Sequence, residues 1–302
     1  MNMGKIAISG SSGLIGKELE SQLKANGHDI LRLVRRKSDK PNDIFWDPTG
    51  AESSDEQLEG LDAIIHLAGE PIANGRWTKK LKKKILSSRV DGTKSLVEAI
   101  SRLKSPPAAF LSASAIGFYG AQCGEEIIDE TGSKGGGFLA DVCEAWEEAS
   151  RSKKLEHTRL VNLRIGVVLD KDGGALGKML LPFKMGVGGT LGSGSQWMSW
   201  ISLKDVTRAI IYALESNDIS GPINLVSPNP VKNKKFTKAL GKALKRPTIL
   251  PAPEFAMKMA FGEMGTETIL SDQRIVPNQL LQHGFEFEHP KIDDAFQSIF
   301  AR

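Results

Sequence analysis

The chain has 302 residues, with 40 lysines and arginines against 36 acidic residues and only two cysteines. A net charge of +4 gives no reason to expect a nucleic-acid partner, and two cysteines cannot form a disulfide framework. No stretch approaches the ~18 apolar residues of a membrane span and no secretory signal opens the chain, so we expect a cytoplasmic protein without membrane contact.

Strands and helices alternate through roughly the first 165 residues, a domain-sized length. Short apolar runs predict buried strands over residues 5–9, 29–34, 62–67, 109–114 and 158–168. Apolar residues at helical spacing predict helices over residues 14–26, over residues 78–103 with Gly92 as a point of interruption, and over residues 138–152. Because parallel strands need crossover helices that cover both faces, we predict a Rossmann-type α/β fold with a doubly wound parallel sheet.

The sequence changes character after Asp170, where eight glycines fall within residues 173–194. We expect this segment to be irregular and to contribute to a substrate pocket, because loops on a rigid scaffold often carry binding residues. Further elements are predicted over residues 206–214, 223–225 and 236–244. A domain of residues 1–250 would thus include a smaller substrate lobe made mainly from residues 170–250, with a short C-terminal domain of residues 251–302 packed on that lobe.

A glycine-rich turn follows the first predicted strand and opens the first predicted helix. Its residues are Gly10, Ser11, Ser12, Gly13, Leu14, Ile15 and Gly16. In this context Gly10 permits a tight turn, Gly13 lets a pyrophosphate approach the backbone, and Gly16 allows close packing of helix and strand. The helix N-terminus then offers N–H groups to phosphates, so the motif predicts a dinucleotide site, with a plain glycine-rich turn as the alternative.

The end of the second strand distinguishes the two nicotinamide cofactors. NAD-preferring sites hold the ribose hydroxyls with an acidic residue there, whereas this chain has Arg35 and Arg36. A guanidinium can form a forked contact with the 2′-phosphate of NADP. The pair therefore predicts NADP(H) in preference to NAD(H), with two surface arginines as the alternative.

Several segments in this order resemble the extended short-chain dehydrogenases/reductases of the epimerase/dehydratase branch. The segments are the glycine turn, His66-Leu67-Ala68-Gly69, Val90-Asp91-Gly92-Thr93, Leu111–Gly120, Leu163–Val168 and Trp200–Val206. Ala68–Ile72, followed by Arg76-Trp77 and a short C-terminal segment, resembles more narrowly the atypical epimerase-family proteins labelled cell-division-inhibitor-like. That subgroup has no firmly attached activity.

The resemblance implies site residues by position. His66, Leu67, Ala68 and Gly69 would line the adenosine and ribose, and His66 would order this loop by hydrogen bonding. Ser112, Ala113 and Ser114 would run beneath the nicotinamide, and Arg164, Ile165, Gly166 and Val167 would flank it. Glu70 and Arg89 complete the expected cofactor site. Glu70, Arg76 and Trp77 could also face substrate, with Trp77 in a structural pair as the alternative.

The tyrosine and lysine that carry protons in this superfamily are missing. Glu147 occupies the place of a glutamate that often follows them, which puts Cys143 at the lysine position and Leu139 at the tyrosine position. Of the expected catalytic groups only the upstream serine remains, as Ser114 or Ser112, with Tyr119 as a substitute acid. The alternative for Tyr119 is a solvated hydroxyl at the pocket rim. Cys143 is expected to be a small buried hydrophobe rather than a redox-sensitive thiol.

No other catalytic pattern stands out. The five histidines show no ligand spacing, so no metal site is expected, and no nucleophile elbow of a hydrolase follows an interior strand. We expect an NADP-dependent oxidoreductase or epimerase of unusual chemistry acting on a small polar substrate. The alternative is a non-catalytic NADP(H)-binding sensor or scaffold with a protein partner. The sequence leaves the substrate and the oligomeric state open.

Overall fold

A seven-stranded parallel sheet forms the centre of the molecule, as predicted. The computed structural model describes residues 4–50 and 55–301. The strand order is β11-β7-β5-β4-β1-β2-β3, and every neighbouring pair runs parallel. The strands are β1 (Lys5–Ser9), β2 (Asp29–Val34), β3 (Asp43–Phe45), β4 (Ala63–His66), β5 (Ala109–Ala115), β7 (Arg159–Ile165) and β11 (Gly221–Leu225).

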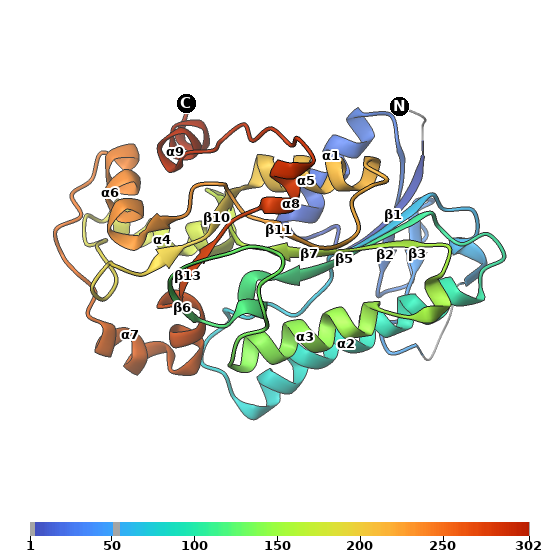
Figure 1. Ribbon diagram of the computed structural model, residues 1–302, viewed down its shortest axis with the longest axis horizontal. Helices are drawn as coiled ribbons and strands as arrows, with labels where there is room; N and C mark the ends of the chain where they lie inside the picture. Colours follow the sequence, from blue (N-terminus) through green and yellow to red (C-terminus); the bar gives the residue numbers. More distant parts are fainter. Residues whose placement is uncertain (1–3, 51–54, 302) are drawn as a thin grey trace.

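Helices cover both faces of this sheet. Figure 1 shows α1 (Leu14–Ala25) and α5 (Leu203–Glu215) above it and α2 (Lys79–Arg102) and α3 (Phe138–Ser150) below it. Side chains of β1 alternate between the two cores: Ile6 and Ile8 join the cluster that includes the helix residues Leu19 and Val206, whereas Ala7 joins the opposite cluster. Burial on both faces explains why these strands are continuous apolar runs.

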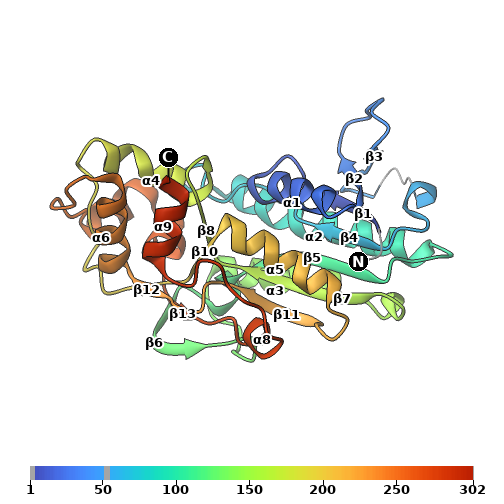
Figure 2. The same cartoon turned by 90° about the horizontal axis from the view of Figure 1, so that it is seen from above.

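A smaller lobe follows the Rossmann part and has a hydrophobic core of its own. It contains β8 (Val167–Asp170), α4 (Gly174–Lys184), β9 (Trp197–Met198), β10 (Trp200–Ser202), β12 (Val231–Lys232), α6 (Asn233–Leu244), α7 (Glu254–Phe261) and α9 (Ile292–Phe300). Phe236 of α6 and Phe296 of α9 are buried in its core, with their ring centroids 5.2 Å apart. Figure 2 shows α6 and α9 together at one end of the molecule.

The tail after residue 250 also returns to the Rossmann part, beyond the expected packing on the lobe. Its strand β13 (Asp272–Ile275) pairs with β6 (Gln122–Ile128). Helix α8 (Asn278–Gln282) follows, and its Leu280 lies in the core cluster above the sheet. The remaining short elements are 3₁₀ turns at Asp55–Leu58, Ile116–Tyr119 and Lys153–Leu155 and a π-helical turn at Gly265–Ile269.

Three local expectations were wrong, and close packing explains two of them. Helix α2 runs unbroken through Gly92, where a Cβ would lie 3.3 Å from the ring of Trp46. The strand expected over residues 158–168 is divided at Gly166, where a Cβ would lie 2.6 Å from Cγ1 of Val226. The segment expected to be irregular contains α4, whose Leu176, Leu180 and Phe183 are buried in the lobe. Here tertiary burial outweighs the weak helix propensity of glycine.

Candidate functional site

The glycine turn between β1 and α1 has a shape that only glycine allows. Gly10 has φ +72°, and a Cβ there would lie 2.9 Å from the nitrogen of Ala68. A Cβ on Gly16 would lie 2.3 Å from the carbonyl oxygen of Gly10, so helix and turn are in direct contact. Gly13 caps α1 without a side-chain hydrogen bond, and the first turn has no acidic residue. The N–H groups and the positive end of the helix dipole are therefore available to an anion.

The other residues of this turn connect it to its surroundings. Ser12 is exposed, Ser11 is buried, and Ile15 packs on the core above the sheet. The side chain of Leu14 reaches the start of α4, because a Cβ on Gly173 would lie 3.2 Å from Leu14 Cδ1. The Rossmann part and the smaller lobe thus meet beside the glycine turn, at the carboxyl edge of the sheet.

Ser9 and His66 hold the neighbouring loop in place. His66 Nδ1 lies 2.6 Å from Ser9 Oγ, and the same Oγ accepts hydrogen bonds from the backbone nitrogens of Leu67 at 3.1 Å and Ala68 at 3.3 Å. Burial lowers the pKa of His66 to about 3, so the imidazole is neutral near neutral pH. His66 therefore contacts this loop through Ser9, which supports the predicted ordering role.

Arg35 and Arg36 directly follow β2, at the strand end where a 2′-phosphate contact was predicted. Both side chains are exposed. Neither forms an ion pair with any residue in the described ranges, whereas Arg32, inside the strand, pairs with Asp43 at 2.6 Å. The two guanidiniums are thus available to a phosphate at this edge of the sheet.

Arg89 lies beneath the loop that carries Gly69 and Glu70. Its Nη1 donates to the carbonyl oxygen of Glu70 at 3.0 Å, and a Cβ on Gly69 would lie 3.3 Å from its guanidinium carbon. The guanidinium also lies over the ring of Trp146, 4.9 Å from its centroid. Burial lowers its pKa, and the nearby Cys143 partly offsets that effect. A largely buried cation therefore lies beside the residue that occupies the lysine position.

Near one end of the sheet's carboxyl edge, a buried ion pair lies beside β5 and β7. Arg164 of β7 donates from Nε and Nη2 to the carboxylate oxygens of Glu147 at 2.8 and 3.0 Å. Ser114 Oγ donates to the same carboxylate at 2.8 Å. The three side chains are 3%, 1% and 2% exposed, respectively. Burial lowers the pKa of Arg164, but its hydrogen bond to Glu147 contributes to a net rise above the ordinary value.

Tyr119 belongs to the same network and has no solvated hydroxyl, so that sequence alternative was wrong. Its hydroxyl donates to Asn224 Oδ1 and accepts from Arg164 Nη1, both at 2.8 Å, and the side chain is 4% exposed. Burial raises its pKa to about 12, although Arg164 acts in the opposite direction. These surroundings favour a structural hydroxyl over an acid for use near neutral pH.

Leu139 and Cys143 face the turn after β5, where the missing tyrosine and lysine would stand. A Cβ on Gly117 would lie 3.2 Å from Leu139 Cβ and 3.6 Å from Cys143 Sγ. Cys143 is buried, and burial raises the pKa of its thiol to about 11. The thiol therefore stays protonated at neutral pH, which confirms the buried-hydrophobe interpretation.

Three further candidate residues lie in the segment just before α2. Trp77 packs edge-on against Phe138 with ring centroids 5.1 Å apart, which supports its structural role. The Glu70 carboxylate pairs with Lys84 at 3.0 Å. Arg76 is exposed and lies 3.3 Å from the position of a Cβ on Gly262.

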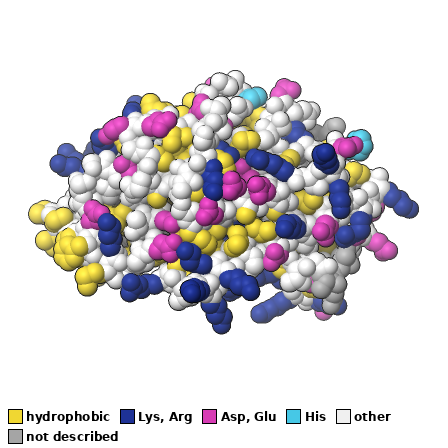
Figure 3. Space-filling view, turned by 60° about the horizontal axis from the view of Figure 1, so that its bottom comes forward, with side chains coloured by type: hydrophobic (Ala, Val, Ile, Leu, Met, Phe, Trp, Pro, Cys, Tyr) yellow, Lys and Arg dark blue, Asp and Glu magenta, His cyan; other side chains and the backbone are white. Residues whose placement is uncertain are grey.

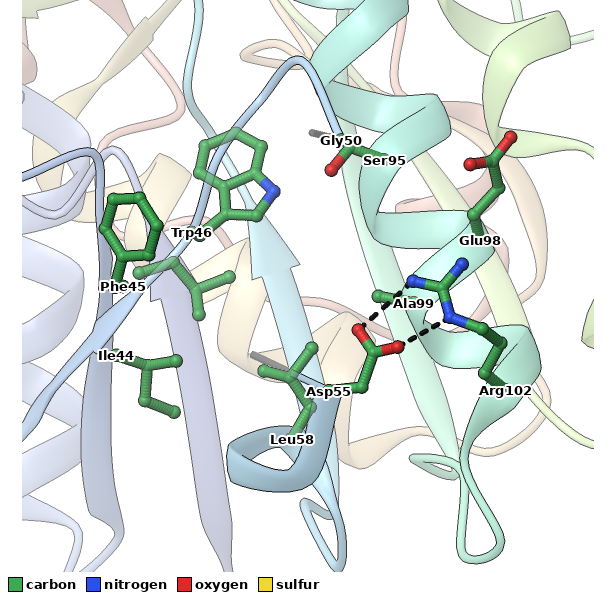
Figure 4. A pocket seen from close by; sticks show the side chains of 11 residues that line it. Ile44, Phe45, Trp46, Gly50, Asp55, Leu58, Ser95, Glu98, Ala99 and Arg102 are labelled. Carbon is green, nitrogen blue, oxygen red and sulfur yellow. Dashed lines mark hydrogen bonds and ion pairs between the residues drawn. The ribbon is translucent and has the colours of Figure 1, made fainter. Parts of the chain in front are cut away.

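A small cavity lies between β3 and α2 (Figure 4). Trp46 and Ile44 line one side and Ser95 the other, and Asp55 pairs with Arg102 at its edge. Its volume of about 20 Å³ has room for a single water molecule. It is therefore too small to be a nucleotide site, and the candidate site remains the sheet edge beside the glycine turn.

Two other types of feature are absent from residues 4–50 and 55–301. No group of three or more histidine, cysteine, aspartate or glutamate side chains is arranged to hold a metal ion there. In the same residues, no helix is both long and apolar enough to cross a membrane.

Comparison with known proteins places this geometry in a family. A model of the NAD-dependent epimerase/dehydratase family matches residues 6–136, and a model described as a domain of unknown function (DUF1731) matches residues 252–299. An epimerase family protein of Mycobacterium bovis is 42% identical over 96% of this chain and 95% of its own. This chain belongs to the epimerase family. The match over nearly the whole length of both chains also confirms the predicted resemblance.

A solved structure of the same family adds ligand information about a relative. The human epimerase family protein SDR39U1, crystallised with NADPH, superimposes with a TM-score of 0.90 at 32% identity, covering 98% of this chain and 99% of that one. An epimerase family protein of Arabidopsis thaliana, described as chloroplastic, is 38% identical over 97% of this chain and 86% of its own. The Rossmann part and the smaller lobe are thus both shared with the human relative.

Sequence reasoning missed two groups in this epimerase family member. Ser9 fixes the loop after β4, and its only local signal is a polar residue at the end of an apolar strand. Asn224 holds Tyr119 from 105 residues away in sequence, and Glu130 accepts from the Asn224 backbone nitrogen at 2.9 Å. No local pattern could have joined these residues, because the folded sheet brings them together.

Proposed function

We propose that this chain binds NADP(H) at the carboxyl edge of its sheet, in a redox or epimerase role. The observation that carries the proposal is the glycine turn, whose close contacts leave no room for a Cβ on Gly10 or Gly16. A turn packed this tightly would let a pyrophosphate approach the backbone closely at the N-terminus of α1. The NADPH-bound structure of the human relative supports the same ligand.

Each group along the edge has a proposed task. The N–H groups after Gly13 would bind the pyrophosphate, and Arg35 and Arg36 would bind the 2′-phosphate. The loop from His66 to Gly69 would line the adenosine and its ribose, at a position that Ser9 fixes. Charge and forked geometry make the arginine pair the main source of selectivity for NADP(H) over NAD(H).

Arg89 is the proposed substitute for the missing lysine. Its guanidinium lies beneath Gly69, next to Cys143 at the lysine position, and it is held by a hydrogen bond to the carbonyl of Glu70. A cation there would attract the nicotinamide ribose hydroxyls and the pyrophosphate. It would support binding without lowering the pKa of a catalytic tyrosine, since Leu139 occupies that place.

Calorimetric titration with NADPH, NADP, NADH and NAD tests the cofactor proposal. We expect NADPH and NADP to bind and to stabilise the protein, by about 2.7 kcal/mol at a hundredfold excess over Kd. Gly16→Ala serves as the loop variant and Gly60→Ala as its matched control, because Gly60 has no atom within 4 Å of its Cβ position. Because Gly60 has φ +69°, an alanine there is strained and lowers stability. The two variants are therefore compared by their affinity for NADPH and not by their stability. Tighter binding of NAD(H) than of NADP(H), or no binding at all, would refute the proposal.

The proposed chemistry is oxidation–reduction or epimerisation of a small polar substrate, such as a nucleotide-sugar-like molecule. A bound nicotinamide supplies hydride transfer, so the protein has to orient the substrate and supply a proton. Ser114 and Tyr119 remain the candidate groups for that step, although both hydroxyls donate within the buried network. A Corynebacterium glutamicum structure described as a nucleoside-diphosphate sugar epimerase, 34% identical, supports this substrate class.

A second candidate is a non-catalytic NADP(H)-binding sensor or scaffold in the cytoplasm. Leu139 and the protonated Cys143 favour it, because neither can exchange a proton at neutral pH. This function predicts a protein partner whose affinity differs between the NADP and NADPH states, and linkage requires an equal change in cofactor affinity. Turnover of NADPH with a panel of carbonyl compounds would favour the enzyme, whereas tight binding with no turnover and a state-dependent partner would favour the sensor.

A further inference from the structure

One end of the smaller lobe exposes an unusual number of large apolar side chains. Seven of the ten large hydrophobic residues found exposed among the described residues belong to two short stretches. They are Leu181, Met185, Val187, Ile249, Leu250, Phe255 and Met259. We call this set the apolar end. Ile249 is 82% exposed and Met259 is 73% exposed, so these side chains project into solvent. Figure 3 shows hydrophobic side chains gathered at the corresponding end of the molecule.

The apolar end is built on an ordered backbone. The nitrogen of Ala252 donates to the carbonyl of Thr190 at 2.8 Å, and the nitrogen of Gly192 donates to the carbonyl of Ala252 at 2.9 Å. These bonds join the segment after α4 to the segment before α7. Phe255 and Met259 then lie one helical turn apart on α7, which has no buried residue. The fold therefore holds the exposed apolar side chains outward.

A strongly basic surface borders the apolar end. Residues 228–262 contain eight lysines and arginines and one acidic residue, Glu254, in a chain whose net charge is only +4. The cations are Lys232, Lys234, Lys235, Lys238, Lys242, Lys245, Arg246 and Lys258. In the described ranges, only Lys232 and Lys258 among them form an ion pair, with Glu125 and Glu254. Six cations are therefore available to an external anion.

Four of these lysines line an open hollow of about 450 Å³. Its walls are Ser193, Gly194, Ser195, Lys232, Lys234, Lys235 and Lys238. The hollow lies near the apolar end, because a Cβ on Gly194 in its wall would lie 2.2 Å from Thr190 Cγ2, and the carbonyl of Thr190 accepts from the nitrogen of Ala252, between Leu250 and Phe255. The apolar side chains and the anion-attracting hollow are therefore neighbouring parts of the same lobe.

We propose that this surface docks on a membrane that contains anionic lipids. Exposed Leu, Ile, Met and Phe side chains would enter the headgroup region, and the lysines would attract the lipid phosphates. A surface contact of this kind needs no membrane-spanning helix. The sequence expectation of no membrane contact rested on the lack of a spanning segment and of a secretory signal, and the present proposal departs from it.

Charge and composition favour a lipid over a protein. A second copy bound about a twofold axis would bring two basic surfaces together at the same interface, which is unfavourable. Protein interface cores are depleted in lysine, whereas four lysines line the hollow of this surface. The combination is typical of interfacial membrane contact.

Vesicle co-sedimentation of the full chain tests the proposal. We expect binding to vesicles of phosphatidylglycerol and phosphatidylcholine in equal parts, and at least tenfold weaker binding to phosphatidylcholine alone. Phe255→Ser with Met259→Ser removes apolar contact, and the matched control Leu86→Ser with Ile127→Ser changes exposed apolar residues elsewhere. Only the first pair is expected to weaken binding, by tenfold or more.

Charge variants complete the test. Changing Lys234, Lys235 and Lys238 to Gln should weaken binding to the anionic vesicles by roughly a hundredfold. The control changes Lys104, Lys153 and Lys154, which are exposed near the C-terminal end of α2, to Gln and so removes equal charge from a surface away from the apolar end. Melting temperature and NADPH affinity, measured for every variant, separate loss of docking from loss of folding or of the cofactor site.

Several results would overturn the proposal. One is the absence of binding to anionic vesicles, and another is an equal loss of vesicle binding in the test and control variants. A further one is a dimer that depends on Phe255 and Met259 and does not bind vesicles. The last result would assign the surface to a second copy of the chain. Capture of an acidic protein in place of vesicles would likewise refute the lipid.

Discussion

The two ends of the sheet's carboxyl edge use their polar groups in opposite ways. At the proposed phosphate end, the start of α1 has no side-chain cap, and the exposed Arg35 and Arg36 form no ion pair among the described residues, so these groups are available to a ligand. At the nicotinamide end, Ser114, Glu147 and Arg164 bond to one another and are buried. The comparison teaches that cofactor binding and chemistry are separable here, because one end is open to a ligand and the other is internally satisfied.

The largest expected effect concerns how much the buried ion pair at the proposed nicotinamide end contributes to stability. Arg164→Met would leave the carboxylate of Glu147 buried without its main partner. We expect the free energy of unfolding to fall by about 3–5 kcal/mol, as for other broken buried ion pairs. Urea denaturation followed by circular dichroism measures this directly.

A paired variant sharpens the interpretation of that loss. Arg164→Met combined with Glu147→Leu removes both charges, so a substantial part of the lost stability should return. Arg159→Met is the control on the same strand, since that side chain donates to backbone carbonyls and pairs with no carboxylate among the described residues. A loss below about 1 kcal/mol for Arg164→Met would show that the two ends are equally open.

The second effect concerns the phosphate end and leaves stability unchanged. Arg35→Ser with Arg36→Ser should weaken NADPH binding by about a hundredfold, equivalent to about 2.7 kcal/mol, because the 2′-phosphate loses its charged partners. Affinity for NADH should change little. Calorimetry with both cofactors measures the difference, and Lys153→Ser with Lys154→Ser provides a control for charge alone. Equal weakening of both cofactors would argue against a 2′-phosphate site.

The third effect is a pH dependence that originates in His66, between the two ends. Its folded-state pKa of about 3 lies below the unfolded value near 6.5, so only the unfolded chain gains a proton between these values. The stability is fully present above pH 6.5 and falls as the pH decreases towards 3. At pH 5 the loss from His66 should be about 2 kcal/mol.

Denaturation at pH 7.5 and pH 5 checks this effect. His66→Asn should lose about 2 kcal/mol less than the unmodified protein over that interval, by the same linkage. His157→Asn, a change at an exposed histidine, should leave the interval unaltered. Identical pH dependence of all three proteins would mean that His66 does not remain neutral in the folded state.

The two ends also differ in how far the sequence predicted them. The glycine turn and Arg35 could be predicted because their roles depend on neighbours within a few residues of a strand end. Glu147 was found by counting along helix α3. Its partner Arg164 lies on strand β7, and Asn224, which bonds Tyr119, lies still farther along the sequence on β11. Interactions that exist only after the sheet has formed leave no local pattern, and the same holds for the return of β13 to β6.

The smallest expected effect decides whether Tyr119 belongs to the locked end or to the chemistry. Tyr119→Phe removes a hydroxyl that bonds Asn224 and Arg164, so we expect a loss of about 1–2 kcal/mol in stability. NADPH affinity should stay unchanged, because the hydroxyl is turned towards β11 and β7. Tyr212→Phe is the matched control, since its hydroxyl bonds the carbonyl of His283 outside the network.

If the hydroxyl is only structural, kcat of Tyr119→Phe with any carbonyl substrate should show the same pH profile as kcat of the unmodified protein. A fall in kcat of about a hundredfold with an altered profile would instead make Tyr119 the proton donor. The nicotinamide end would then be an active site whose acid is sequestered until substrate binds.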